Sequence, residues 1–339
     1  MRQAVMIRPG NIEFRQVPAP GPLKDYEILM RIKRIGICGS DVHVYHGKHP
    51  ATPYPVVQGH EYSAVVEATG KQVSGIKPGQ MVTARPQLTC GTCGPCRRGQ
   101  YNTCQHLKVQ GFQAPGVAQD LFVTDEERTV VLDETMTYEQ GAMVEPCAVG
   151  AHATHRLDLT GQNVVVSGAG TIGNLVAQFA KARGANKVLI TDLSAYRLDI
   201  ARQCGLEGVW NLASGSFEEG IHSYFGKDGF QVGFEAAGVK SSLDVLMQYV
   251  EKGGSLVILG VYEQNPVVNM YFLGEHELNV FGSMMYRQED YETAAEMIAS
   301  GLIKTDPLLS RIFPFEEYLQ AYRFIEEQGD RTMKVMISV

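Results

Sequence analysis

Four cysteines lie close together in the stretch CGTCGPCRRGQYNTC, at Cys90, Cys93, Cys96 and Cys104. The spacing C-x2-C-x2-C-x7-C interleaves thiols with Gly and Pro, so a short lobe can wrap four sulfurs around one tetrahedral ion. Four thiolates with no open position make a closed, structural site, and the pattern predicts zinc. An iron–sulfur cluster uses similar short spacings, but nothing else in the chain indicates electron transfer. The total of seven cysteines is odd, and this clustering is untypical of a disulfide framework, so we expect reduced thiols.

A second set of metal-binding side chains is dispersed: Cys38 in GICGSDVH, His60 and Glu61 in VVQGHEYS, and Glu145 and Cys147 in VEPCAVG. Taken singly, a buried cysteine or a packed histidine is the commoner explanation for each. Together they offer the Cys/His/acid set of a catalytic zinc that keeps one position open for water or a substrate oxygen. By ligand preference alone, Cys147 is as good a candidate as Glu145.

His60 and Glu61 are neighbours, and neighbouring side chains on a regular strand point to opposite faces. They can therefore share one ion only on irregular backbone, which the preceding Gly59 makes plausible.

A glycine-rich stretch, GAGTIG, follows the apolar run 164–166 and precedes a helical pattern. Gly168 allows the turn, Gly170 lets the backbone approach a pyrophosphate, and Gly173 permits close packing of helix on strand. Asp192 closes the next predicted strand at the spacing expected for an acid that binds the adenosine ribose. A carboxylate there repels a 2′-phosphate, so the sequence predicts NAD rather than NADP. Arg197 could lie beside the adenosine or be a solvated helix charge.

Two kinds of elements must position these residues. The pattern of residues 1 to about 135 predicts short strands separated by Gly and Pro, including 28–37, 62–66 and 81–84. From about 160 strands alternate with helices, among them a helix over 175–182, which indicates βαβ units and a parallel sheet. The tail holds helical stretches near 291–300 and 316–327 and ends in the strand-like MKVMISV, which we expect to return to the first domain.

Composition limits the classes of function. At 339 residues the chain is long enough for two domains. A net charge of −7, a pI near 5.8 and the absence of any basic run argue against nucleic acid as a partner. No apolar run approaches the ~18 residues of a membrane span, and no signal-peptide pattern opens the chain. We therefore expect a cytoplasmic protein without a membrane partner.

The motifs GICGSDVH, GHE, the four-cysteine lobe and GAGTIG occur in this order in the zinc-dependent medium-chain dehydrogenase/reductase superfamily, which the chain resembles over essentially its whole length. The resemblance is strongest to the sorbitol (polyol) dehydrogenase branch, whose EPxxVGxHA and TDLSxxRL segments are matched at 145–153 and 191–198. In the alcohol dehydrogenase branch itself a cysteine aligns with Glu145. The resemblance thus favours Glu145 as a ligand and makes Cys147 a small packed hydrophobic residue.

The resemblance implies an α/β fold in three parts. These are a GroES-like, mostly-β catalytic domain over 1–147 with a structural zinc lobe at about 86–108, an NAD-binding Rossmann domain with a doubly wound parallel sheet over 148–284, and a C-terminal segment over 285–339 that returns to the catalytic domain. It also implies two zinc ions per chain, one structural and one catalytic, and a homo-oligomer, with a tetramer favoured over a dimer.

The family's roles carry over residue by residue. Cys38 and His60 resemble direct ligands of the catalytic zinc, and Glu61 and Glu145 are two carboxylates of which one binds directly and the other holds the water or exchanges with it. Ser40 matches the hydroxyl that binds the substrate alcohol, and His43 the histidine that passes its proton towards solvent. Further positions align with cofactor contacts, namely Ile172, Asp192, Arg197, Leu259 and Val261.

The implied reaction moves a hydride from a secondary alcohol of a polyol or sugar-derived substrate to NAD+ and gives a ketone. Two departures argue against glucitol itself: Met285 stands where the branch has an arginine, with Tyr286 retained and Arg287 one residue late, and Val44 replaces a tyrosine. A diol, another sugar alcohol, a sugar acid or a sugar phosphate stays open. The alternatives are an L-threonine or 2,3-butanediol dehydrogenase, or a nucleotide-binding regulatory protein on this fold, for which loss of Cys38 or His60 would be the sign.

Overall fold

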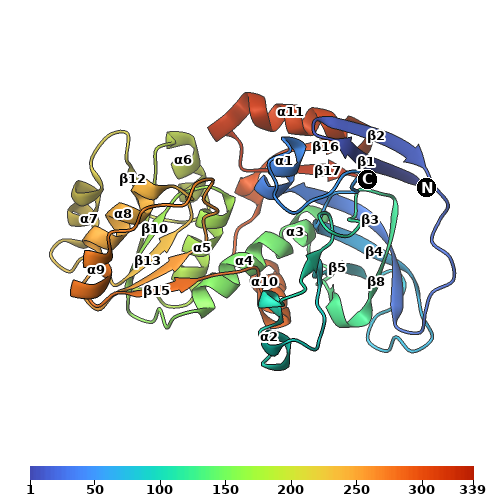
Figure 1. Ribbon diagram of the computed structural model, residues 1–339, viewed down its shortest axis with the longest axis horizontal. Coiled ribbons are helices and arrows are strands. Elements are labelled where there is room, and N and C mark those ends of the chain that lie inside the picture. Colours follow the sequence, from blue (N-terminus) through green and yellow to red (C-terminus); the bar gives the residue numbers. More distant parts are fainter. The chain divides into compact units, whose positions relative to one another are not determined.

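The computed structural model describes residues 1–339 and divides into two compact units. The first unit contains Met1–Glu145, Arg287–Ser300 and Leu309–Val339, and the second contains Pro146–Tyr286 and Gly301–Leu308. The first unit is therefore built from both ends of the chain, and in Figure 1 the red C-terminal strands run beside the blue N-terminal ones.

A seven-stranded sheet forms the centre of the first unit, in the order β16-β17-β3-β4-β5-β9, with β8 paired to β3. Along β3, Ile28, Met30 and Ile32 alternate into the core while Arg31 faces solvent, as a half-buried strand requires. The predicted strands at 28–37, 62–66 and 81–84 are all present. The strands of this sheet are β3 (Glu27–Ile37), β4 (Glu61–Thr69), β5 (Met81–Ala84), β8 (Leu121–Asp125), β9 (Thr129–Val131), β16 (Leu309–Pro314) and β17 (Lys334–Ser338).

Short elements surround this sheet. Two small ribbons pair β1 with β2 and β6 with β7, and the cysteine lobe lies between β6 and β7 in sequence. The remaining elements of the first unit are β1 (Arg2–Arg8), β2 (Asn11–Gln16), β6 (Gln87–Leu88), β7 (Lys108–Val109), α1 (Gly39–Tyr45), α2 (Gly94–Arg97), α3 (Tyr138–Ala142), α10 (Gln288–Ala299) and α11 (Tyr318–Gln328), with 3-10 turns at Tyr101–Thr103, Glu126–Arg128, Phe315–Glu317 and Gly329–Arg331.

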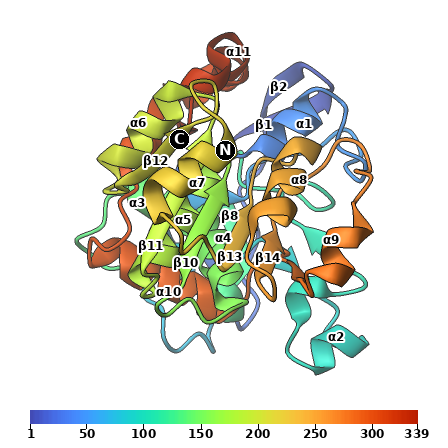
Figure 2. The same ribbon diagram turned by 90° about the vertical axis from the view of Figure 1, so that its left-hand side faces the viewer.

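The second unit is a six-stranded parallel sheet in the order β12-β11-β10-β13-β14-β15 (Figure 2). The order reverses after β10, which is the doubly wound pattern that the alternation of strands and helices predicts. The central strand β10 (Asn163–Ser167) is buried along its whole length. The other elements are α4 (Val144–His155), which crosses the unit boundary, α5 (Thr171–Ala182), β11 (Lys187–Asp192), α6 (Ala195–Gln203), β12 (Gly208–Asn211), α7 (Phe217–Phe225), β13 (Val232–Glu235), α8 (Lys240–Tyr249), β14 (Ser255–Ile258), α9 (Met270–Glu275), β15 (Asn279–Gly282) and a 3-10 turn at Asp306–Leu308.

The predicted fold class, a mostly-β part and a Rossmann-type parallel sheet, is confirmed. One boundary differs: α5 begins at Thr171 and not near Leu175, because Gly170 already serves as its N-cap and the turn after the glycine is helical. No helix in the structure combines the length and the apolar character that a membrane crossing needs.

Candidate metal centres and cofactor loop

Cys38, His60 and Glu61 come together in the first unit, with one ligand atom of each lying within 4.8 Å of the others. Cys38 follows β3 and caps α1, while His60 and Glu61 stand where β4 begins. Gly59 has a φ of 91°, so the irregular backbone expected before His60 is present. A thiol, an imidazole and a carboxylate around one point form a set of donors that suits zinc.

Gly36 makes room for the Glu61 carboxylate. It pairs with Glu61 across β3 and β4, and a Cβ atom at position 36 would lie 2.2 Å from Glu61 Oε2. This role of Gly36 is invisible in the sequence, because it depends on the register of two strands.

Lys334 holds Glu61 from the other side. The last strand, β17, pairs antiparallel with β3, and this places Lys334 Nζ 2.7 Å and 2.6 Å from the two Glu61 oxygens and 3.2 Å from the carbonyl oxygen of Ile37. Both charged side chains are buried. No motif in the sequence marks Lys334 as part of the site; the available signal is a single lysine inside the apolar strand MKVMISV.

Negative charge collects around this centre. Burial alone lowers the pKa of His60, but the carboxylates of Asp41 and Glu145 contribute to raising it well above its ordinary value. Burial likewise lowers the pKa of Lys334, yet Glu61 leads the neighbouring charges that raise it overall. Glu145 is buried but stands outside the close group of three donors. A field that favours protonated histidine and lysine also favours a bound cation.

The first turn of α1 carries three polar side chains with different surroundings. Asp41 is buried, and its Oδ2 accepts the N–H of Cys38 at 2.9 Å, which fixes the thiol relative to the helix. Ser40 and His43 are partly exposed and three residues apart, so they share one helix face. Cys147 is fully buried in α4 and belongs to neither group of metal-binding side chains.

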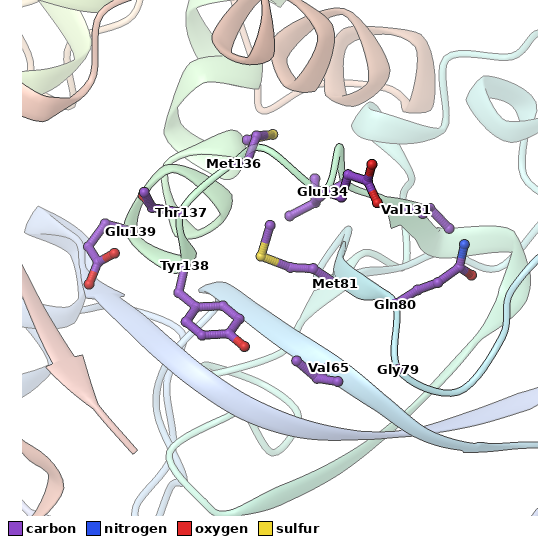
Figure 3. A pocket seen from close by; sticks show the side chains of 11 residues that line it. Val65, Gly79, Gln80, Met81, Val131, Glu134, Met136, Thr137, Tyr138 and Glu139 are labelled. Carbon is purple, nitrogen blue, oxygen red and sulfur yellow. The ribbon is translucent and has the colours of Figure 1, made fainter.

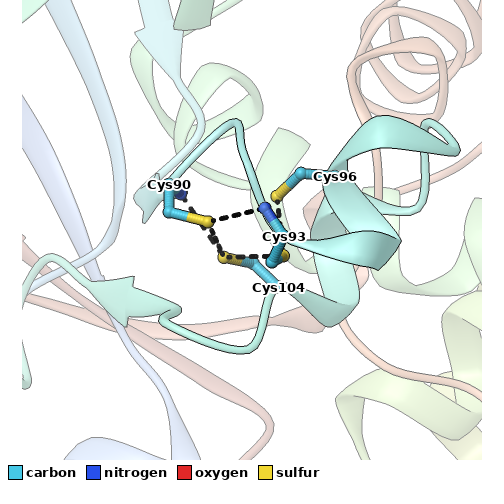
Figure 4. Close-up of side chains that lie close together, drawn as sticks. All are labelled: Cys90, Cys93, Cys96 and Cys104. Carbon is cyan, nitrogen blue, oxygen red and sulfur yellow. Dashed lines mark hydrogen bonds between the residues drawn. The ribbon is translucent and has the colours of Figure 1, made fainter.

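The four cysteines of the lobe face one another, as Figure 4 shows. Their Sγ atoms lie 3.4 Å apart for Cys93 and Cys96, 3.9 Å for Cys93 and Cys104, and 3.6 Å for Cys104 and Cys90. Sulfurs about 2.3 Å from one tetrahedral zinc are separated by about 3.8 Å. The lobe therefore fits a single ion, whereas the cysteines of a multi-iron cluster bind different irons and stand further apart.

Backbone N–H groups prepare the lobe for thiolates. Cys104 Sγ accepts the N–H groups of Cys90 and His106, each at 3.4 Å, and Cys90 Sγ accepts the N–H of Cys93 at 3.3 Å. Backbone hydrogen bonds from Thr92 and Cys93 lower the pKa of the Cys90 thiol to about 5, whereas burial and the neighbouring thiols raise the pKa of Cys96 to about 12. Thiolate is the form that binds metal.

The glycines between β10 and α5 differ in what a side chain would meet at each position. Gly168 has a φ of 102°, the position of a Cβ at Gly170 meets nothing within 4 Å, and a Cβ at Gly173 would lie 1.8 Å from the carbonyl oxygen of Gly168. The loop thus turns at Gly168, leaves space for a ligand beside Gly170 and packs closely at Gly173. Ile172 follows in the first turn of α5.

Asp192 lies beside this loop at the end of β11. Its Oδ2 accepts the N–H of Ala169 at 2.7 Å and its Oδ1 the N–H of Ser194 at 2.8 Å. Arg197 Nε is buried without a hydrogen-bond partner, so its N–H is available to donate to a ligand. The two remaining predicted cofactor contacts, Leu259 and Val261, follow β14, and Val261 is 82% exposed.

A separate hollow of about 610 Å³ opens in the first unit between Met81 on β5 and the segment 131–139 (Figure 3). Its walls carry the Tyr138 ring and the Met136 side chain. No residue of either metal centre lines it, so we do not assign the chemistry to this hollow.

Comparison with known proteins agrees with this geometry. Residues 24–134 match the model of the alcohol dehydrogenase GroES-like domain, and residues 171–300 match that of the zinc-binding dehydrogenase. The chain is 30% identical to the sorbitol dehydrogenase of Bacillus subtilis (99% of this chain, 97% of that one) and 32% identical to an L-threonine 3-dehydrogenase of Legionella pneumophila (94% of each). A zinc-binding dehydrogenase from Sinorhizobium meliloti, solved with NADP, is similar with a TM-score of 0.92, 28% identity and coverage of 100% and 99%.

Replacing Lys334 by Met should lower the free energy of unfolding by about 3 kcal/mol, because Glu61 then stays buried without its partner. Urea unfolding followed by circular dichroism measures the change. Adding Glu61→Gln to Lys334→Met removes the stranded charge and should recover most of the loss. A cost below about 1 kcal/mol for the single change would show that the pair behaves like an exposed one.

Replacing Gly173 by Ala should weaken NADH binding about tenfold or more, because the new Cβ displaces the Gly168 carbonyl and overpacks the loop. Fluorescence titration with NADH gives the dissociation constant. Gly274→Ala in α9 is the matched control, since its Cβ meets nothing within 4 Å. Equal affinity in the two variants would contradict the packing role of Gly173.

Proposed function

The chain belongs to the zinc-dependent medium-chain dehydrogenases of the alcohol dehydrogenase superfamily, oxidoreductases that act on CH–OH groups with a nicotinamide cofactor, and we propose that it oxidises a secondary alcohol of a polyol or sugar-derived substrate to a ketone with NAD+. The observation that carries the proposal is the convergence of Cys38, His60 and Glu61 on one point. Retention of all three donors argues against a regulatory protein that has lost its chemistry.

Two zinc ions per chain are part of the proposal. The four-cysteine lobe would hold the closed, structural ion, and Cys38 and His60 would hold the catalytic one together with a carboxylate. Glu61 lies in the close group with Cys38 and His60 and Glu145 does not, so Glu61 is the better candidate for the direct ligand, with Lys334 holding its carboxylate in place. Glu145 would then be the second carboxylate, which holds the water of the metal or exchanges with it.

When bound, zinc supplies a Lewis acid that makes the alcohol oxygen more acidic, and the nicotinamide supplies the hydride acceptor. Ser40 would accept the alcohol proton on its hydroxyl oxygen and release its own hydroxyl proton in the same transfer. His43, three residues further on the same face of α1, would take the proton on a ring nitrogen and release it to solvent. Lys334 would keep the Glu61 carboxylate in place while this proton moves.

The comparisons support a polyol substrate and a threonine substrate almost equally. Sorbitol dehydrogenase and L-threonine 3-dehydrogenase are similar to this chain at 30% and 32% identity, so a threonine substrate is the second candidate. Arg287 does not replace the missing arginine freely, because it is the N-cap of α10 and pairs with Glu289 at 2.9 Å. Met285 itself has a φ of 50°, a conformation that residues other than glycine seldom adopt.

Metal content and turnover test the proposal together. Elemental analysis should find about two zinc ions per chain, and Cys38→Ser should remove about one while leaving the other in the lobe. NADH formation should be seen with at least one member of a panel of sugar alcohols, vicinal diols, sugar acids and sugar phosphates. Turnover of threonine alone would move the assignment to the second candidate, and iron in place of zinc, or no turnover with any compound, would contradict the proposal.

Cofactor preference forms a separate prediction, because a similar protein was solved with NADP. We expect kcat/KM to favour NAD+ over NADP+, since Asp192 repels a 2′-phosphate by about 1 to 4 kcal/mol at a distance near 4 Å. Asp192→Ser should lower this ratio about tenfold or more. Asp199→Ser, on the exposed face of α6, is the control, and an equal ratio in both variants would exclude Asp192 as the determinant.

A further inference from the structure

Behind His60 lies a row of buried polar side chains that ends on helix α11. Asp41 Oδ1 stands 3.6 Å from His60 Nδ1, and the same oxygen accepts Gln58 Nε2 at 3.3 Å. Gln58 Oε1 in turn accepts the hydroxyl of Tyr322 at 2.9 Å. All four side chains are at most 5% exposed. We call them the Tyr322 network.

The direction of each hydrogen bond follows from chemistry. An ionised carboxylate only accepts, so the NH2 end of the Gln58 amide must face Asp41. The carbonyl end then faces Tyr322, whose O–H can donate to it. The carbonyl oxygen of Asp41 also accepts Gln58 Nε2 at 3.3 Å, so Asp41 fixes which end of the amide faces it, and the Tyr322 hydroxyl anchors the other end. A flipped amide would present its oxygen to the carboxylate and repel it.

Tyr322 itself has little freedom to move. Its ring stacks on Tyr45 with centroids 4.8 Å apart and an interplanar angle of 4°, and it also stacks on Tyr318 at 5.9 Å. Its hydroxyl is therefore a fixed point in the interior of the first unit.

The far end of the network is incomplete. His60 Nδ1 is buried and has no hydrogen-bond partner at the distance seen here. A histidine that binds a metal through one ring nitrogen donates the N–H of the other to a carboxylate or carbonyl, and such partners fix the orientation of the ring. Asp41 is the group in place to accept it, because its Oδ1 faces His60 Nδ1 at 3.6 Å. Its other oxygen, Oδ2, already accepts Cys38 N–H at 2.9 Å.

We propose that Tyr322 and Gln58 are positioning residues of the catalytic metal centre, in which the phenol of Tyr322 anchors the Gln58 amide and the amide in turn holds the Asp41 carboxylate ready for His60. The proposal rests on the proposed function, because it requires a metal at Cys38, His60 and their carboxylate. Helix α11 would thus contribute to the affinity of the site for its metal, although no sequence motif near Tyr322 indicates this.

Three variants test this: Tyr322→Phe, Gln58→Leu and the two combined. Zinc affinity is measured on the full chain by competition with a chromogenic chelator, and the ion in the four-cysteine lobe serves as an internal reference for folding. We expect each single change to weaken the catalytic site about tenfold, the usual range for partners behind a ligand being about 10 to 100-fold. The double variant should lose no more than Gln58→Leu alone, because Tyr322 acts through Gln58.

Tyr318→Phe is the matched control, because it removes a buried phenol from the same helix and the same ring stack without a hydrogen bond to Gln58. It should leave the affinity within about twofold of the unchanged protein. With cobalt in the site, the visible absorption bands should shift in Tyr322→Phe and not in Tyr318→Phe, since they report ligand geometry.

Unchanged zinc affinity in Tyr322→Phe would overturn the proposal, and so would additive losses in the double variant or an equal loss in Tyr318→Phe. Failure of the proposed function looks different: the unchanged protein would then bind only the lobe's ion. If it binds two ions and the Tyr322 and Gln58 variants hold both as tightly, the proposed function stands and only the role of the Tyr322 network is wrong.

Discussion

The buried ion pair between Lys334 and Glu61 is the interaction on which the proposed metal centre depends. Moving an unpaired carboxylate from water into a protein interior costs several kcal/mol even after relaxation. Here Asp41, Glu61 and Glu145 are all buried in the first unit, near the thiol of Cys38. Lys334 offsets one of these charges, and a divalent cation is suited to offset more. The strand order β17-β3-β4 places the lysine opposite its partner, so the topology of the sheet serves the electrostatics of the site.

The two groups of metal-binding side chains differ in how they are built. The lobe takes all its sulfurs from one short stretch, and its backbone N–H groups stabilise the thiolates locally. The other centre takes Cys38 from the end of β3 and His60 from the start of β4, which meet because the two strands are antiparallel. Its counter-charge comes from the C-terminal strand. Its geometry therefore reports on the fold of the whole unit, whereas that of the lobe does not.

This difference explains what the sequence could and could not predict. The cysteine lobe, the glycine loop and Asp192 follow from spacing, because their geometry is determined within a few dozen residues. The fold class follows from the change of periodicity near residue 160. Gly36, Gln58, Tyr322 and Lys334 were missed because each acts through a strand register or a helix contact far along the chain. The choice between Glu61 and Glu145 stayed open in the sequence for the same reason, since only the fold brings Glu61, and not Glu145, into the close group with Cys38 and His60.

The assembly of the first unit from both ends of the chain has a consequence for synthesis in the cell. Lys334 follows Glu61 by 273 residues, so at about 5 to 20 residues per second the ribosome adds it roughly 14 to 55 s later. The contiguous segment Pro146–Tyr286 is translated within that interval. A nascent chain thus carries Glu61 without its counter-charge while most of the second unit already exists. The proposed metal centre is therefore completed after the second unit, and a ribosome that stalls late leaves a chain that has its glycine loop but lacks Lys334 beside Glu61.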